Sequence, residues 1–229
     1  MDIGHEMAEV IDGTRQFLHQ MREMGEEEVL LHKVIGETAA PSAKRLQTLC
    51  ESIDKNCQKC SLGKTRTNLV FGTGDSEAGI MFVGEAPGEE EDRQGLPFVG
   101  PAGQLLTKII QSIKLEREAV YITNILKCRP PKNRDPAPHE IACCESHLIC
   151  QIETVQPRVI CALGRIAGQT LLKTDDSLAK LRSKLHDYRG IKLVVTYHPA
   201  ALLRNPGWKR ETWEDVKRLR REYDGLEIR

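Results

Sequence analysis

Residues 79–88 read GIMFVGEAPG, a short apolar run that leads into a glycine-rich turn with a carboxylate. Three more apolar runs follow at residues 120–123, 159–163 and 193–196, and stretches with helical spacing separate them. Short, continuously apolar strands that alternate with helices are typical of a parallel sheet covered on both faces. The sequence therefore predicts an α/β fold with a four-stranded parallel sheet flanked by helices.

Helices are expected where apolar residues recur at intervals of three and four. In the main part of the chain they are predicted at residues 102–113, 138–154, 166–172 and 209–223. Residues 6–24 and, more weakly, 26–35 also have helical spacing, and 37–43 read as a linker. We thus expect two parts: an acidic helical N-terminal extension with its linker, residues 1–45, and a main domain, residues 46–229.

Charge and composition exclude several classes of protein. The 229 residues contain 33 basic and 33 acidic side chains, which excludes a strongly polybasic chain but not a local basic face. Residues 1–45 carry five basic and nine acidic residues, so the remainder is mildly basic. No apolar run is long enough to cross a membrane, and the N-terminus lacks the basic start of a secretory signal. We expect a cytoplasmic protein without a membrane segment.

The residues that directly follow the four strands point to the functional site. Ligands of open α/β sheets bind outside the carboxyl ends of the strands. Those ends are followed by Gly84–Gly88, Asn124–Pro130, Gly164–Arg165 and Tyr197–Ala201. Glycine, carboxylate, amide, thiol, guanidinium and imidazole groups are thereby expected at one edge of the sheet.

Eight cysteines in a cytoplasmic chain favour metal ligation over disulfides. Cys57 and Cys60 are separated by two residues, whereas Cys128 and Cys144 form a widely spaced pair. Four thiolates can hold zinc or an iron–sulfur cluster. Zinc sites usually repeat the short spacing in both halves, so the single short pair tilts towards a cluster, although spacing alone leaves both open. Cys143, next to Cys144, makes the fourth ligand ambiguous.

Three blocks of sequence resemble family 4 uracil-DNA glycosylases, the iron–sulfur members of that superfamily. The blocks are residues 84–100, 124–136 and 197–204, in the same order and spacing, and the resemblance covers about residues 55–223. It implies a 4Fe–4S cluster on Cys57, Cys60, Cys128 and Cys144. It also implies a repair enzyme that hydrolyses the N-glycosidic bond of uracil in single- and double-stranded DNA and leaves an abasic site for base excision repair.

The resemblance implies a role for each residue in the pocket. Gly84, Ala86, Pro87 and Gly88 would shape the substrate site, and Phe98 would stack on the flipped base. Asn124 would pair with the polar edge of uracil, and His198 would donate to uracil O2 as negative charge develops there. Glu85 would orient the attacking water and Glu91 would exclude the methyl group of thymine, a division that the sequence does not settle. Each of these residues also fits an ordinary core, turn or loop position.

Contacts with DNA are expected from basic residues at the same edge and from two leucines. Leu202 and Leu203, read as part of an exposed loop, would form an apolar wedge in the duplex, unless they fold back onto the core. The basic residues are Arg129, Lys132, Arg134, Arg165, Arg204, Lys209 and Arg210, which could grip phosphates or form a solvated face.

Two other functions compete with this interpretation. A non-catalytic, metal-stapled nucleic-acid-binding module would use the arginines but would not need Glu85, Asn124 or His198. A nucleotide-binding enzyme would use residues 84–88 as a phosphate cradle, but this turn lacks the lysine and Ser/Thr of a phosphate loop, and Glu85 would repel phosphate. We expect a monomer that acts on uracil-containing DNA, with no known partner for residues 1–45.

Overall fold

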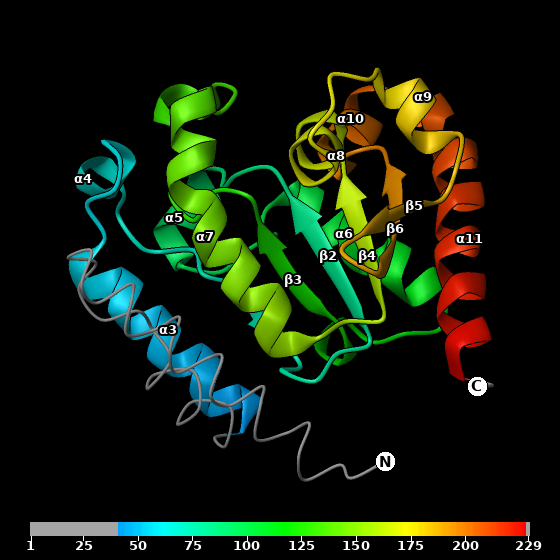
Figure 1. Ribbon diagram of the computed structural model, residues 1–229. Helices are drawn as coiled ribbons and strands as arrows, with labels where there is room; N and C mark the ends of the chain where they lie inside the picture. The colour runs from blue at the N-terminus through cyan, green and yellow to red at the C-terminus, as the bar shows by residue number, and fades with distance from the viewer. Residues whose placement is uncertain (1–40, 228–229) are drawn as a thin grey trace, which may run out of the picture. The chain divides into compact units, whose positions relative to one another are not determined.

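The computed structural model describes residues 41–227, whose six strands form one sheet in the order β1-β3-β2-β4-β6-β5 (Figure 1). The four central strands are parallel and are those predicted: β2 (Ile80–Gly84), β3 (Tyr121–Asn124), β4 (Val159–Leu163) and β6 (Ile191–Thr196). Antiparallel edge strands β1 (Thr73–Gly74) and β5 (His186–Tyr188) complete it. The prediction of a purely parallel, four-stranded sheet is therefore wrong at both edges.

Both edge strands are too short to show an alternating pattern of apolar residues. The first has two residues, and the second is joined to β6 by a two-residue hairpin turn. In that turn Arg189 and Gly190 both have positive φ angles, 53° and 84°. Such turns match the twist of the two strands of a hairpin. In a sequence they are usually recognised by an Asn-Gly or Asp-Gly pair, whereas the pair here is Arg189-Gly190.

The four helices predicted in the main part of the chain are confirmed, with ends that differ by a few residues. The α-helices are α3 (Ser42–Asn56), α4 (Leu62–Thr65), α5 (Glu89–Gln94), α6 (Pro101–Ser112), α7 (Pro138–Val155), α8 (Arg165–Leu172), α9 (Leu178–Arg182), α10 (Pro199–Arg204) and α11 (Lys209–Glu227). Short 3-10 helices span Arg117–Ala119, Pro131–Asn133 and Pro206–Trp208. Within residues 41–227 no helix has both the length and the apolar character needed to cross a bilayer.

Helix α3 occupies the place where the sequence indicated the end of a linker. It begins at Ser42, so the expected boundary between residues 45 and 46 lies inside this helix. One of its apolar residues, Ile53, packs against the core of the sheet. The helical stretches predicted at residues 6–24 and 26–35 lie outside the described residues.

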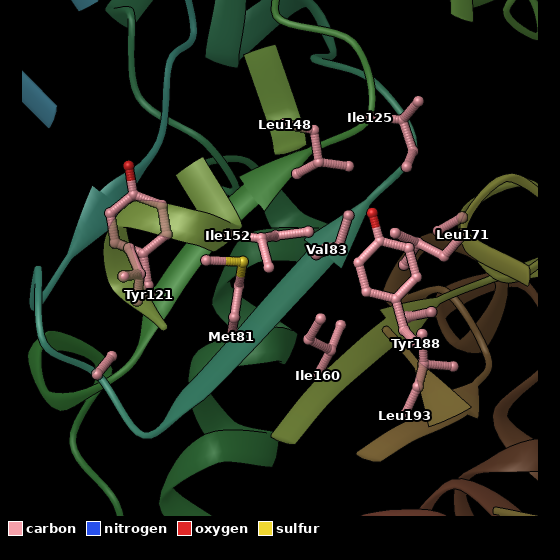
Figure 2. Packing of buried hydrophobic residues seen from close by; sticks show 14 of the residues in the cluster. Met81, Val83, Tyr121, Ile125, Leu148, Ile152, Ile160, Leu171, Tyr188 and Leu193 are labelled. Atoms are coloured by element: carbon pink, nitrogen blue, oxygen red, sulfur yellow. The ribbon is translucent and has the colours of Figure 1, made fainter. Parts of the chain in front are cut away.

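The sheet is buried on both faces, which explains why its central strands are apolar throughout. On one face Met81 and Val83 belong to a cluster that includes residues of α7, such as Leu148 (Figure 2). On the other face the alternate residues Ile80 and Phe82 belong to a cluster with residues of α6 and α11. Because both faces are covered, the ends of the strands are left as the place for a site.

A strained turn precedes α6. Phe98 has a φ angle of 53°, a left-handed conformation that non-glycine residues rarely adopt. Two contacts hold the turn. A Glu91 carboxylate oxygen, Oε1, accepts hydrogen bonds from the backbone N–H groups of Val99 and Gly100, both at 3.0 Å. Gly103 packs so closely that a Cβ atom there would lie 1.8 Å from the carbonyl oxygen of Phe98.

We expect Gly103→Ala to lower the free energy of unfolding by about 1–3 kcal/mol, because the added methyl must displace a backbone carbonyl. The matched control is Gly225→Ala in α11, where an added Cβ meets nothing within 4 Å. Alanine is the better helix former, so the control is expected to gain up to about 1 kcal/mol. Chemical denaturation measures both variants, and equal stability of the two would contradict the packing described for Phe98.

Candidate active site

The register of β2 and β3 brings two predicted site residues together. Gly84 and Asn124 are direct partners at the carboxyl ends of these strands. A Cβ atom at Gly84 would lie 2.3 Å from Asn124 Oδ1 and 2.5 Å from Phe98 Cζ. Only glycine lets the amide and the aromatic ring approach each other so closely.

A pocket of about 360 Å³ opens at this edge of the sheet. Its size is in the range of small-molecule sites. Its lining includes most of the residues predicted for the substrate site: Glu85, Ala86, Pro87, Gly88, Glu91, Phe98, Asn124 and His198. Arg134, Asp135 and Arg204 also line it. Three of the four loops that follow the strands therefore line the pocket, as expected. In the fourth loop, a Cβ atom placed on Gly164 would lie 3.0 Å from His198 Cβ.

Asn124 carries an unused hydrogen-bond acceptor at the base of this pocket. Asn124 is only 1% exposed. Among the buried side-chain nitrogen and oxygen atoms of residues 41–227, its Oδ1 is the one that lacks a hydrogen-bond partner. A buried polar atom without a partner is costly, so such an atom in a pocket indicates a ligand that completes the bond.

His198 is held in one neutral form. Its Nδ1 accepts a hydrogen bond from the Ala200 backbone N–H at 3.2 Å, so the proton of the neutral ring is on Nε2. Burial, with a smaller effect of Arg204, lowers the pKa of His198 to about 4. The ring lies 5.5 Å from that of Phe98, centroid to centroid. At neutral pH His198 is therefore an uncharged hydrogen-bond donor beside an aromatic face.

Tyr197, the residue before this histidine, contacts an aromatic ring and a guanidinium group. The Tyr197 ring stacks on Trp208, with centroids 4.7 Å apart, and the Arg182 guanidinium carbon lies 4.1 Å from its centroid. Arg182 also donates from Nε to buried Asp215 at 2.7 Å, and Asp215 accepts from the Thr196 hydroxyl at 2.8 Å. These contacts fix the end of β6, from which the imidazole extends into the pocket.

The two predicted carboxylates differ in their surroundings. Burial, together with the nearby Asp135 carboxylate, raises the pKa of Glu85 to about 7, and Arg165 partly opposes this. Glu91 instead binds the backbone of the turn after Phe98. Glu85 therefore exchanges its proton near neutral pH, whereas one oxygen of Glu91 is occupied in shaping the pocket.

Several predicted DNA contacts have structural partners. Arg134 donates two hydrogen bonds, at 2.9 and 2.7 Å, to the buried carboxylate of Glu140, which also accepts from the Ala137 backbone N–H at 2.8 Å. This pair anchors the start of α7. Arg129 contacts Asn133 and Glu89, and Arg165 contacts Asp135 and Gln169. Arg204 is exposed at the rim.

The two leucines are not in an exposed loop, as the sequence suggested, but in the short helix α10. Leu202 is 1% exposed and Leu203 is 47% exposed. Neighbouring residues of a helix point about 100° apart, so one leucine faces the core while the other faces solvent. The expectation that Leu202 enters DNA is corrected, and only Leu203 is accessible.

The four predicted ligand cysteines line one cavity, together with Cys143 and His147. Cys57 Sγ lies 3.5 Å from His147 Nε2. Two further thiols have donor groups nearby: Arg66 donates to Cys128 Sγ at 3.5 Å, and the Lys127 backbone N–H lies near the Cys144 thiol. Within the described part of the chain, no three Cys, His, Asp or Glu side chains come close enough to share one metal ion.

Sequence reasoning missed four residues around these two cavities: Gly103, Lys127, Asp135 and His147. In the sequence, Lys127 stands out only as a charged residue in the run between Asn124 and Cys128. In the structure, Lys127 is 1% exposed. Its Nζ donates to the Thr123 hydroxyl at 2.7 Å and to the Asn124 carbonyl at 2.6 Å. The contacts of the others depend on distant segments and have no local sequence pattern.

Comparison with known proteins identifies the family. Residues 71–217 match the model of the uracil DNA glycosylase superfamily. A type-4 uracil-DNA glycosylase of Archaeoglobus fulgidus is 46% identical over 172 residues, which cover 72% of this chain and 86% of the relative. Type-4 enzymes of Saccharolobus solfataricus (48%, covering 72% and 81%) and Thermotoga maritima (45%, covering 72% and 88%) are similarly close. The chain therefore belongs to the type-4 uracil-DNA glycosylases of this superfamily.

Proposed function

We propose that the pocket at the ends of β2, β3 and β6 hydrolyses the N-glycosidic bond of uracil in DNA. As a type-4 uracil-DNA glycosylase, the protein removes uracil from DNA for base excision repair. The assignment of this chemistry to the pocket rests on one observation: the partnerless Oδ1 of Asn124 lies in the same pocket as the neutral ring of His198.

Asn124 recognises the base through its amide. Uracil presents an N–H donor at N3 and an acceptor at O4, which match the amide oxygen and the amide nitrogen. Cytosine offers the opposite pattern at these two atoms, so a fixed amide rejects it. The extruded base stacks on Phe98, whose ring the glycine at position 84 allows close to the amide.

His198 and Glu85 act on the bond that breaks. As the glycosidic bond lengthens, the sugar gains positive charge and uracil gains negative charge at O2. The Nε2–H of His198 donates to O2, and because this charge is largest in the transition state, the contact increases the rate. Glu85 orients the water that attacks C1′ of the sugar and accepts its proton.

Glu91 helps to exclude thymine. One carboxylate oxygen fixes the turn after Phe98, and the other, Oε2, lies 2.7 Å from the position of a Cβ atom on Gly88. Glu91 lines the pocket, and a methyl group on the C5 atom of a base that faces this carboxylate would be placed against it. We thus assign the C5 position to Glu91 and the water to Glu85.

DNA lies across the rim of the pocket. Arg129, Arg165 and Arg204 contact phosphates, while Arg134 mainly holds the start of α7 through Glu140. Leu203 is the wedge that supports extrusion of the base from a duplex. Single-stranded substrates, which need no such wedge, are also accepted.

The cysteine cavity holds a 4Fe–4S cluster on Cys57, Cys60, Cys128 and Cys144. The donor set fits, because four thiols surround one cavity and the positive charges of Arg66 and Lys127 lie near them. Four thiolates can hold a zinc ion or a cluster, and membership of the type-4 family favours the cluster. When bound, the cluster braces the segments that carry its ligands.

A non-catalytic DNA-binding module is less well supported. Such a module would not need a buried amide acceptor without a partner or a histidine fixed as a neutral donor. We propose that the enzyme acts as a monomer, because the groups assigned to the site all come from one chain. The reduced thiols required by the cluster suit the cytoplasm. The separate character of residues 1–45 stays a prediction.

His198→Ala is expected to lower the single-turnover rate of uracil excision by about 10²–10³, because a donor to the developing anion is lost. The affinity for uracil-containing DNA should change much less. The wild-type protein should produce alkali-labile sites in a uracil oligonucleotide and none in a matched thymine oligonucleotide. Excision by His198→Ala at the wild-type rate would show that the proposed mechanism is wrong.

The excision rate should rise with pH through a midpoint of about 7, because Glu85 must be ionised to orient the water. His198, with a pKa of about 4, stays neutral over this range and does not contribute. Single-turnover rates between pH 5.5 and 8.5 test this. Glu85→Gln should be slow and independent of pH, while the exposed Glu90→Gln should keep the wild-type profile. If Glu85→Gln kept the wild-type pH profile, a residue other than Glu85 would act as the base.

Cys144→Ala is expected to lose iron and the brown colour, whereas Cys143→Ala should keep both. The two residues are adjacent on α7 and point about 100° apart, so only one of them can face the cluster without distortion. Iron content and visible absorbance measure the outcome. Iron loss confined to Cys143→Ala would reverse the assignment, and a colourless wild-type protein containing zinc would exclude the cluster.

A further inference from the structure

Lys127 lies in the wall of the cysteine cavity and contacts the backbone of Asn124, a residue that lines the other pocket. It follows β3 by three residues and belongs to the continuously buried segment 121–128. It lines the cysteine cavity together with Cys144, and its backbone N–H lies near the Cys144 thiol. Its side chain turns back towards β3, where its Nζ donates to the Asn124 carbonyl at 2.6 Å and the Thr123 hydroxyl at 2.7 Å.

A buried ammonium is expensive unless its hydrogen bonds are satisfied and negative charge is near. Here the acceptors are the Thr123 hydroxyl and the Asn124 carbonyl at the end of β3. A leucine or methionine would fill this space without the cost of burying a charge. The charge is therefore retained for the contacts it makes.

The strand end that Lys127 holds is the one that carries the amide of the pocket. Asn124 has no side-chain partner for Oδ1, so its orientation depends on its backbone and on the packing around it. On one side Gly84 fixes the backbone through the β2–β3 register. On the other side the carbonyl of the same residue is fixed by the ammonium of Lys127.

We propose that Lys127 is a positioning residue that ties the wall of the cysteine cavity to the backbone of Asn124, and so keeps the amide aligned for the uracil edge. The inference rests on the role proposed for Asn124. It gives the cysteine centre a direct mechanical path to base recognition: Lys127 lines the cavity, directly precedes Cys128, and holds the carbonyl of the recognising residue. The lysine does not touch the substrate.

The test is a double-mutant cycle with Lys127→Met and Asn124→Ala. Lys127→Met keeps the length of the side chain but removes the donor, and should lower the single-turnover rate by about 10- to 100-fold, as expected for a lost hydrogen bond from a charged group. In the Asn124→Ala background the same change should cost less than about twofold, because the two residues act as one unit. The affinity for DNA that carries an uncleavable uracil analogue should fall. The affinity for DNA that carries an abasic analogue should not.

The control is Lys59→Met, which removes a positive charge from the lining of the same cavity, where Lys59 Nζ donates to Ser146. It should leave excision unchanged. Iron content should be wild-type in Lys127→Met, and the visible circular dichroism of the cluster should shift, since a residue that lines its cavity moves. If Lys127→Met does not fold, Thr123→Val, which removes one acceptor of the ammonium, should show a smaller loss that also disappears in Asn124→Ala.

The outcomes separate the two proposals. Equal losses from Lys127→Met in the two backgrounds would overturn the coupling to Asn124 and leave the proposed function intact. Wild-type excision by Asn124→Ala alone would overturn the proposed recognition role of the amide, and the coupling with it.

Discussion

The site depends on how closely two parallel strands and an aromatic ring approach each other at Gly84. The β2–β3 register places Gly84 opposite Asn124, and there is no room for even a methyl group between the amide, the Phe98 ring and the backbone. A pocket that holds a flat base needs such an approach, because its floor and its recognising edge must lie within the width of one ring. The left-handed turn at Phe98, with Gly103 packed beneath it, follows from the same requirement.

Burial sets the charge state of the groups at the strand ends. It keeps His198 neutral at physiological pH and brings the pKa of Glu85 to about 7. A neutral donor suits a leaving group that becomes negative, since a permanently charged one would also bind other anions before the reaction begins. A carboxylate that ionises near neutral pH suits a water that must lose a proton. One physical cause, removal from water, thus gives two side chains different roles.

The cysteine cavity and the pocket share the segment after β3. Asn124 ends the strand, Lys127 follows it, and Cys128 lines the neighbouring cavity. This segment is continuously buried, which leaves a change at the thiols little freedom to relax into solvent. Under the coupling proposed for Lys127, a centre that takes no part in bond breaking affects the alignment of the base.

The sequence alone predicted the parallel centre of the sheet, the strand ends at which the pocket opens and the four cysteines that line one cavity, because apolar periodicity and motif spacing are local properties. It did not predict the short edge strands, whose pairing depends on distant residues, or the burial of Leu202, since two adjacent leucines in α10 look the same until one packs against the core. It also did not reveal that Arg134 is held by Glu140. The partnerless oxygen of Asn124 and the bridging contacts of Lys127 exist only once the chain has folded, because hydrogen-bond satisfaction is decided by which groups from separate segments come within reach.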